Sequence, residues 1–270
     1  IDRSRGLGDV YKRQKKYIYI YIEKTDSSEV WLLDKANPLG NLELVLKRSE
    51  DHLYSIEDGG DYFYALTNHD NAKNFKIMRL EKNDFQNIEN WEELLEVRDT
   101  HYIEDMLAFK DFVIIQSRYD GIPIIEVFNL AKKSLNQIDM KDEVYDLGLV
   151  YNNDFNSSFF RYSYSSLKTS PQISKYNLYE NTNTLVWKKQ VDNFIDTDYE
   201  VKRIKTVARD NTEVPVSIVY KKGLDLENAP MLIYGYGSYG INMDSGFRPT
   251  ITPLLNRGFI FAIAQIRGGA

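Results

Sequence analysis

The sequence YIYIYI at residues 17–22 is a run of aromatic and β-branched residues, and comparable runs return at regular intervals along the chain. They are YFYALTN from residue 62, FVIIQSR from 112 and FFRYSYSS from 159, which gives steps of 45, 50 and 47 residues. A second strand-like run follows each of them: EVWLLD, FKIMRLE, IIEVFNL and ISKYNLYE. A period of roughly 40–50 residues with about four strands per unit is typical of propeller blades. The spacing therefore predicts a partial β-propeller of several four-stranded blades, with a β-sandwich of accidental spacing as the alternative.

The pattern changes near residue 200. Two strand-like runs, VKRIKTVA and VPVSIVYKK, flank a turn in which Asp210 and Asn211 suit a hairpin. Two continuous apolar runs follow, MLIYGYG at 231–237 and FIFAIAQI at 259–266, as in a sheet that is covered on both faces. A short crossover helix near PLLNRG, ended by Gly258, would join them. These features predict the beginning of an α/β domain after the propeller.

The predicted boundaries follow from these two patterns. Residues 15–198 form the partial propeller, and residues 199–270 form the N-terminal part of the α/β domain. Residues 1–14, IDRSRGLGDVYKRQ, show neither strand nor helix spacing and are expected to be a non-native or disordered leader. We expect the chain to be a piece of a longer protein, truncated at both ends, because a closed propeller and a doubly covered sheet both need more strands.

One segment inside the predicted propeller favours a helical turn. It is NIENWEELLEV at residues 87–97, with Asn90 as a possible N-cap. The neighbouring acids Glu92 and Glu93 would diverge by about 100° on a helix and could not easily share a proton or a metal ion. Both are expected to be solvated.

Composition excludes several classes of function. The chain has 34 Lys and Arg against 40 Asp and Glu, a formal net charge of −6, so no overall positive field favours nucleic acid as a partner. It has no cysteine, which excludes disulfides and thiolate metal sites and fits a cytoplasmic location. Its three histidines, His52, His69 and His101, lack the spacing of metal ligands, so no metal is expected. No run of 18 apolar residues occurs, and no membrane partner is expected.

The glycines after the run MLIY raise the question of a phosphate-binding loop. Gly235, Gly237 and Gly240 spell G-x-G-x-x-G directly after a strand, as a dinucleotide-binding motif requires. Such a motif also needs a helix that opens on the loop. Pro249 and Pro253 interrupt the segment where that helix would run. The sequence therefore disfavours nucleotide binding, and no cofactor is expected.

Two roles in acyl transfer are also conceivable for this loop. Ser238 is not in the frame of a G-x-S-x-G nucleophile elbow, because Tyr236 stands two residues before it, and no histidine follows it. We therefore expect Ser238 to be a turn residue. A loop after an early strand of a hydrolase can instead supply donors to an oxyanion hole. Tyr236, between two glycines, is placed to offer its phenolic O–H, although core or surface packing is the more common role of a tyrosine.

The segments PMLIYGYGSYG and LLNRGFIFAIAQIRGG resemble the prolyl oligopeptidase family of serine peptidases, and most of all its oligopeptidase B members. The resemblance extends through VARDNTEVPVSIVYKK, YSSLKTSPQISKYNLYE and SSEVWLLD, so it covers nearly all of residues 15–270. It implies that a propeller caps an α/β-hydrolase domain. It also implies that the partners are short peptides, which oligopeptidase B cuts after lysine or arginine.

The resemblance assigns roles to particular residues. Tyr236 matches the tyrosine of the family's oxyanion hole, and Asp244 matches an acid that contacts the P2 side of the substrate. Some members carry a second acid at the position of Gly246, so a weaker preference for a basic P2 residue is expected here. Arg267 matches an R-G-G turn and is expected to have a structural role. The nucleophilic serine, the aspartate and the histidine would lie beyond Ala270, so these 270 residues alone are expected to be inactive.

Two alternatives remain open at this point. A prolyl oligopeptidase would share Tyr236 but cut after proline. A propeller that serves as a non-catalytic interaction module would need no hydrolase chemistry at all.

Overall fold

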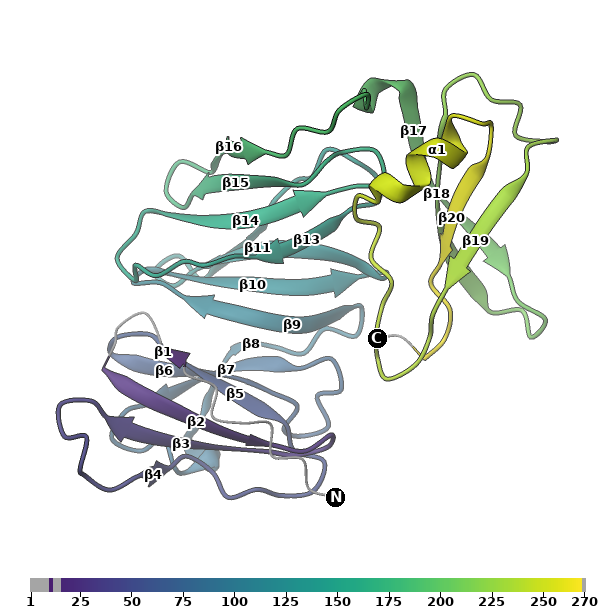
Figure 1. Cartoon of the computed structure of the whole chain (residues 1–270). Helices are drawn as coiled ribbons and strands as arrows, with labels where there is room; N and C mark the ends of the chain where they lie inside the picture. The colour runs from purple at the N-terminus through teal and green to yellow at the C-terminus, as the bar shows by residue number, and fades with distance from the viewer. Residues whose placement is uncertain (1–9, 12–15, 269–270) are drawn as a thin grey trace. The chain divides into compact units, whose positions relative to one another are not determined.

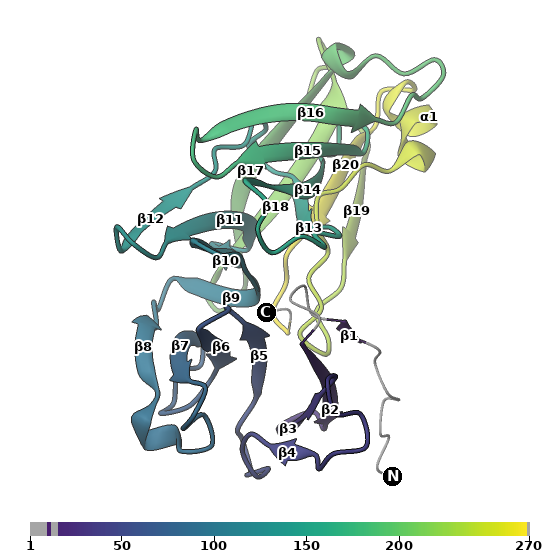
Figure 2. The ribbon, with the colours of Figure 1, turned by 90° about the vertical axis from the view of Figure 1, so that its left-hand side faces the viewer.

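The computed structural model describes residues 10–11 and 16–268, which form five four-stranded sheets. Two of these sheets lie in the first third of the chain, and their strands run in chain order. The first sheet contains β1 (Val10–Tyr11), β2 (Tyr17–Glu23), β3 (Ser28–Asp34) and β4 (Glu43–Leu44). The second, whose strands lie side by side in Figure 2, contains β5 (Tyr54–Asp58), β6 (Tyr62–Thr67), β7 (Lys76–Glu81) and β8 (Glu92–Leu95).

The next two sheets repeat this arrangement. The third has the strand order β12-β11-β10-β9 and contains β9 (His101–Ala108), β10 (Phe112–Tyr119), β11 (Ile122–Asn129) and β12 (Ser134–Gln137). The fourth contains β13 (Asp146–Leu149), β14 (Phe159–Ser165), β15 (Gln172–Asn177) and β16 (Thr182–Lys188). The four runs of the sequence repeat are β2, β6, β10 and β14, and the runs that follow them are β3, β7, β11 and β15. The prediction of four-stranded blades is confirmed, and the β-sandwich alternative is wrong.

The predicted leader, residues 1–14, falls mostly outside the described residues. Within it, Val10 and Tyr11 pair with Tyr19 and Ile18 of β2 as a short antiparallel edge.

Clustering of the backbone divides the chain into two compact units. The first consists of residues 1–117, 126–136 and 151–158, and the second of residues 118–125, 137–150 and 159–270. The predicted boundary between residues 198 and 199 stays a prediction.

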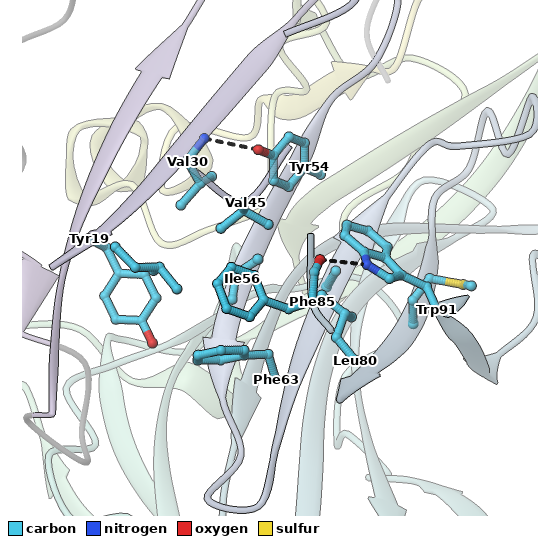
Figure 3. Close-up of a cluster of buried hydrophobic side chains, with 12 residues drawn as sticks. Tyr19, Val30, Val45, Tyr54, Ile56, Phe63, Leu80, Phe85 and Trp91 are labelled. Carbon is cyan, nitrogen blue, oxygen red and sulfur yellow. Dashed lines mark hydrogen bonds between the residues drawn. The ribbon is translucent and has the colours of Figure 1, made fainter. Parts of the chain in front are cut away.

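An aromatic core holds the first two sheets of the first unit together (Figure 3). Tyr54 is buried there, and its hydroxyl accepts hydrogen bonds from the backbone N–H groups of Val30 at 3.0 Å and Leu46 at 3.1 Å. Trp91 donates from its indole nitrogen to the Phe85 carbonyl at 2.9 Å. Because each of these polar atoms has a partner, the large rings are buried without the cost of an unsatisfied group.

The predicted helical turn at residues 87–97 is largely wrong. A single 3₁₀ turn, η1 (Ile88–Asn90), is followed at once by strand β8, and Asn90 ends the turn rather than capping a helix. Glu92 lies opposite Arg79 and pairs with it. Glu93 lies 3.6 Å from Lys76 Nζ. Both acids are exposed, as predicted, and each also pairs with a cation on β7.

His52 and His69, 17 positions apart in the sequence, flank the β5–β6 hairpin, with ring centroids 5.5 Å apart. His52 also stacks on Tyr54 and hydrogen-bonds Thr67 Oγ1 at 2.9 Å. Burial, reinforced by the neighbouring His69 and opposed by Asp70, lowers the pKa of His52 below its usual value. Burial beside Arg98 lowers the pKa of His101 as well.

These two lowered pKa values predict that acid weakens the fold. Between the folded-state pKa and about 6.5, the unfolded chain binds more protons than the folded chain. The stability is therefore complete above pH 6.5 and is lost as the pH falls below it, by at most about 1.4 kcal/mol per pH unit for each histidine. Urea unfolding followed by tryptophan fluorescence from pH 7.5 to 5.5 should show this decrease. The decrease should be smaller in His52→Gln, and an equal slope in that variant would contradict the assignment to His52.

The fifth sheet lies in the second unit and has the strand order β17-β18-β20-β19 (Figure 1). Its strands are β17 (Tyr199–Val207), β18 (Glu213–Lys221), β19 (Met231–Gly235) and β20 (Ile260–Ala264). A short 3₁₀ turn, η2 (Asp196–Asp198), precedes β17, while η3 (Pro249–Ile251) and α1 (Thr252–Leu255) connect β19 to β20. β17 and β18 are antiparallel, whereas β19 and β20 are parallel.

The hairpin and the short crossover helix predicted for this segment are confirmed. Asn211 takes φ +67° in the β17–β18 turn, and Gly258 takes φ +84° just after α1. Alternate residues of β18 and β20 are buried in two clusters on opposite faces, so both strands are covered on both sides. Within the described residues β19 pairs with β20 alone, and its side chains, such as Ile233, are exposed. The prediction that β19 is covered on both faces stays a prediction.

One apolar residue of the fourth sheet enters the core of the fifth. Leu167, in the loop between β14 and β15, is 1% exposed and packs in one cluster with Val219, Leu255 and Phe261. A buried carboxylate, Asp142, holds this loop in place.

Asp142 is surrounded by donors from the loop and from β14. It accepts hydrogen bonds from Thr169 Oγ1 at 2.9 Å and from the Tyr164 hydroxyl at 2.8 Å, and Lys168 Nζ lies 3.3 Å away. Burial alone would raise the pKa of Asp142, but the hydrogen bonds from Ser166, Tyr164 and Thr169 lower it overall. The charged form of Asp142 therefore stabilises the loop that carries Leu167.

Among the residues that the structure describes, no helix is long and apolar enough to cross a membrane.

Candidate functional site

The loop after β19 is the candidate site. Its glycines permit a close approach between the backbone of this loop and the backbone of the turn after β20. Gly240 N–H donates to the Gly268 carbonyl at 3.1 Å. A side chain on Gly237 would overlap the Arg267 carbonyl, and one on Gly268 would overlap the Gly237 carbonyl. Only glycine permits such an approach, so these residues bring the loop after β19 against the turn after β20.

The loop does not have the form of a dinucleotide site. No helix begins between Tyr236 and Arg248, so no helix N-terminus faces the glycines. A phosphate at this loop would therefore lack the N–H groups and the dipole of a helix N-terminus.

Ser238 is a turn residue, as predicted. The Ile241 N–H donates to the Ser238 carbonyl at 3.1 Å, and the two residues between them, Tyr239 and Gly240, take φ values of +57° and +67°. This is the geometry of a turn with two left-handed central residues. A nucleophile elbow would need a helix directly after the serine, and none follows here.

Tyr236 leaves the end of β19 between Gly235 and Gly237. Its side chain is 38% exposed, and within residues 16–268 its hydroxyl takes part in no hydrogen bond. The phenol therefore offers an O–H donor at the carboxyl end of a parallel strand, which is where open α/β sheets bind their ligands.

Asp244, the second predicted site residue, has a partner that no local pattern predicts. Arg118 Nη1 donates to Asp244 Oδ1 at 2.6 Å, and Arg118 Nη2 donates to Oδ2 at 3.1 Å. The two residues are 126 positions apart. No motif surrounds Arg118, so only the fold could reveal this pair.

Gly246, where some relatives are expected to carry an acid, lies against the fourth sheet. A Cβ atom there would be 3.0 Å from Asp146 Oδ2 and 3.2 Å from Ser165 Oγ. The neighbouring Phe247 N–H donates to the same Ser165 hydroxyl at 3.3 Å, which fixes the distance between the two segments. An acidic side chain at position 246 would therefore both overlap its neighbours and face the carboxylate of Asp146.

Arg267 points away from the glycine loop and pairs with Asp210 in the β17–β18 turn. The Arg267 guanidinium lowers the pKa of Asp210 to about 2. This contact fits the structural role that the sequence predicted for Arg267.

The described residues contain no group of three or more His, Asp or Glu side chains arranged to hold a metal ion.

Known proteins are similar to this chain over nearly its whole length. Residues 3–190 match the family described as "Prolyl oligopeptidase, N-terminal beta-propeller domain". Dipeptidyl aminopeptidase BI of Pseudoxanthomonas mexicana is 32% identical over 99% of the chain, and Protease 2 of Moraxella lacunata is 31% identical over 94%. The chain spans 37% and 36% of the lengths of these two relatives.

Solved structures show the same similarity. Oligopeptidase B from Leishmania major matches 96% of the chain with a TM-score of 0.88 and 28% identity, and the chain covers 38% of it. Oligopeptidase B from Trypanosoma brucei, solved with covalently bound antipain, matches with the same values.

Proposed function

This chain belongs to the prolyl oligopeptidase family of serine peptidases, and on that premise we propose that it is part of a serine oligopeptidase that cuts short peptides after lysine or arginine. The similarity to Protease 2 and to oligopeptidase B structures over more than nine-tenths of the chain supports this choice within the family. In this proposal residues 15–198 are part of the propeller, and residues 199–270 begin the α/β-hydrolase domain.

The observation that carries the proposal is the position of Tyr236. Its exposed phenol lies at the carboxyl end of β19, beside the parallel strand β20, on a loop that the glycines hold against the next turn. A donor in this position suits the oxyanion that forms when a serine attacks a peptide carbonyl.

The proposed mechanism is acyl transfer to water. The serine oxygen bonds to the carbonyl carbon, the carbonyl oxygen becomes an oxyanion, and the Tyr236 hydroxyl donates a hydrogen bond to it. The tetrahedral intermediate then expels the amine, and water hydrolyses the acyl-enzyme. We propose that the nucleophilic serine, the aspartate and the histidine are not among these 270 residues, in which no histidine follows His101. The 270 residues alone are therefore proposed to be inactive.

The test is hydrolysis of two reporter peptides by the full-length protein. A reporter with arginine at the scissile position should be cut with a kcat/KM about 100-fold or more above one with proline there, because only the first can pair with carboxylates. The reverse ratio would favour a post-proline peptidase. A folded full-length protein that cuts neither reporter would contradict the peptidase proposal and favour a propeller that only binds.

A further inference from the structure

The pair of Arg118 and Asp244 fixes a long-range contact within the second unit. Arg118 is at the end of β10, and Asp244 is in the loop after β19. Both oxygens of the carboxylate accept hydrogen bonds from the guanidinium. The side chains are 10% and 28% exposed, so the pair is largely shielded from water.

The turn that carries Arg118 is held in place independently. Arg118 Nη1 lies 3.3 Å from the Gly121 carbonyl, within its own turn. Arg203 of β17 pairs with the Asp120 carboxylate at 3.3 Å and also donates to the Asp120 carbonyl. Arg118 is therefore presented to Asp244 by a fixed turn, so little side-chain freedom is lost when the pair forms.

Asp244 belongs to a loop whose place in the sheet is typical of ligand sites. It lies in the loop at the carboxyl end of β19, and the crevice outside the carboxyl ends of the strands is the usual ligand site of open α/β sheets. A free carboxylate in such a place would recognise a guanidinium or ammonium group. In this structure Arg118 already occupies both of its oxygens.

We propose that Arg118 is a specificity-determining residue: it occupies Asp244 and thereby suppresses selection for a basic side chain at the P2 position of the substrate. This inference rests on the proposed peptidase function. A basic P2 side chain would compete with Arg118 for the Asp244 carboxylate, and a displaced Arg118 would lose its two hydrogen bonds to that carboxylate. The ion pair that forms between the P2 side chain and Asp244 is offset by the loss of the pair between Arg118 and Asp244. Peptides with arginine and with a neutral residue at P2 are therefore cut at similar rates.

The experiment compares two reporters that share arginine at P1 and carry either arginine or glycine at P2. In the full-length wild-type protein their kcat/KM values should agree within about threefold. In Arg118→Gln the ratio should rise about tenfold or more in favour of arginine, and it should return to the wild-type value in Arg118→Gln/Asp244→Asn. Lys205→Gln is the matched control, since it removes an exposed ion pair with Glu213 in the same unit and should leave the ratio unchanged.

A binding measurement separates this inference from the peptidase proposal. Calorimetric titration with argininamide should show about tenfold tighter binding to Arg118→Gln than to the wild type, whether or not any peptide is cut. If the affinity for argininamide changes as expected but no peptide is hydrolysed, only the peptidase proposal is contradicted. If neither the affinity nor the P2 ratio changes in a folded Arg118→Gln protein, the inference is overturned. Should that variant fail to fold, Arg118→Lys, which keeps the charge but loses the two-pronged contact, should show a smaller shift in the same direction.

Discussion

Replacement of Tyr236 by phenylalanine in the full-length protein is expected to lower kcat by about 10²–10³-fold, with little change in KM. The hydroxyl would bind the oxyanion only as it develops, so its loss affects the transition state more than the bound substrate. One such donor is worth roughly 3–4 kcal/mol of barrier. Steady-state hydrolysis of the arginine reporter measures the effect.

The stability of Tyr236→Phe distinguishes a role of the hydroxyl in the oxyanion hole from a role of the side chain in packing. The Tyr236 ring stays in the variant, and its hydroxyl makes no hydrogen bond within residues 16–268, so the midpoint of urea unfolding should not change. Tyr239→Phe is the matched control, because that tyrosine belongs to the same loop and is 91% exposed. A fall in kcat of less than threefold in Tyr236→Phe, or an equal fall in Tyr239→Phe, would rule out the oxyanion role.

The largest expected loss of stability comes from Arg98→Met in the first unit. Arg98 donates two hydrogen bonds of 2.7 Å to the carboxylate of Glu126 on β11, and Ser117 Oγ donates a third at 3.0 Å. The Glu126 side chain is 4% exposed. Removal of the cation leaves a buried carboxylate without its counter-charge, which typically costs about 3–5 kcal/mol.

Urea unfolding of the full-length protein measures this loss. Arg98→Met/Glu126→Leu should recover most of it, because no buried charge remains in the double variant. Lys205→Met, which breaks an ion pair whose side chains are 52% and 63% exposed, should cost far less than Arg98→Met. If Arg98→Met costs no more than Lys205→Met, the pair does not stabilise the first unit as argued.

Local patterns explain why so much of the fold could be predicted. The strand repeat from residue 17 onward matched β2, β6, β10 and β14, because strand-forming residues and the turns between them act over a few neighbours. The crossover before β20 was predictable for the same reason, since Gly258 ends a short helix whatever lies around it. The helix expected at residues 87–97 failed because β8 pairs with β7, a strand that ends eleven residues earlier, and Leu94 and Leu95 pack against a core cluster there.

The candidate site, too, was predictable from the sequence only in part. The sequence singled out Tyr236 and Asp244 within one loop, but the partner of Asp244 lies 126 residues earlier and has no local signal. Likewise the reason for glycine at position 246 is the carboxylate of Asp146 on another sheet.

The sequence by itself determined the repeating blades, the two strands and short crossover helix near the C-terminus, and the loop that carries Tyr236. These depend on alternation, turn residues and glycine conformations, which are properties of neighbouring residues. Only the tertiary structure decided that Arg118 occupies Asp244 and that Arg98 neutralises Glu126. Charge pairing and burial depend on distance in space, and the folded chain alone brings those groups together.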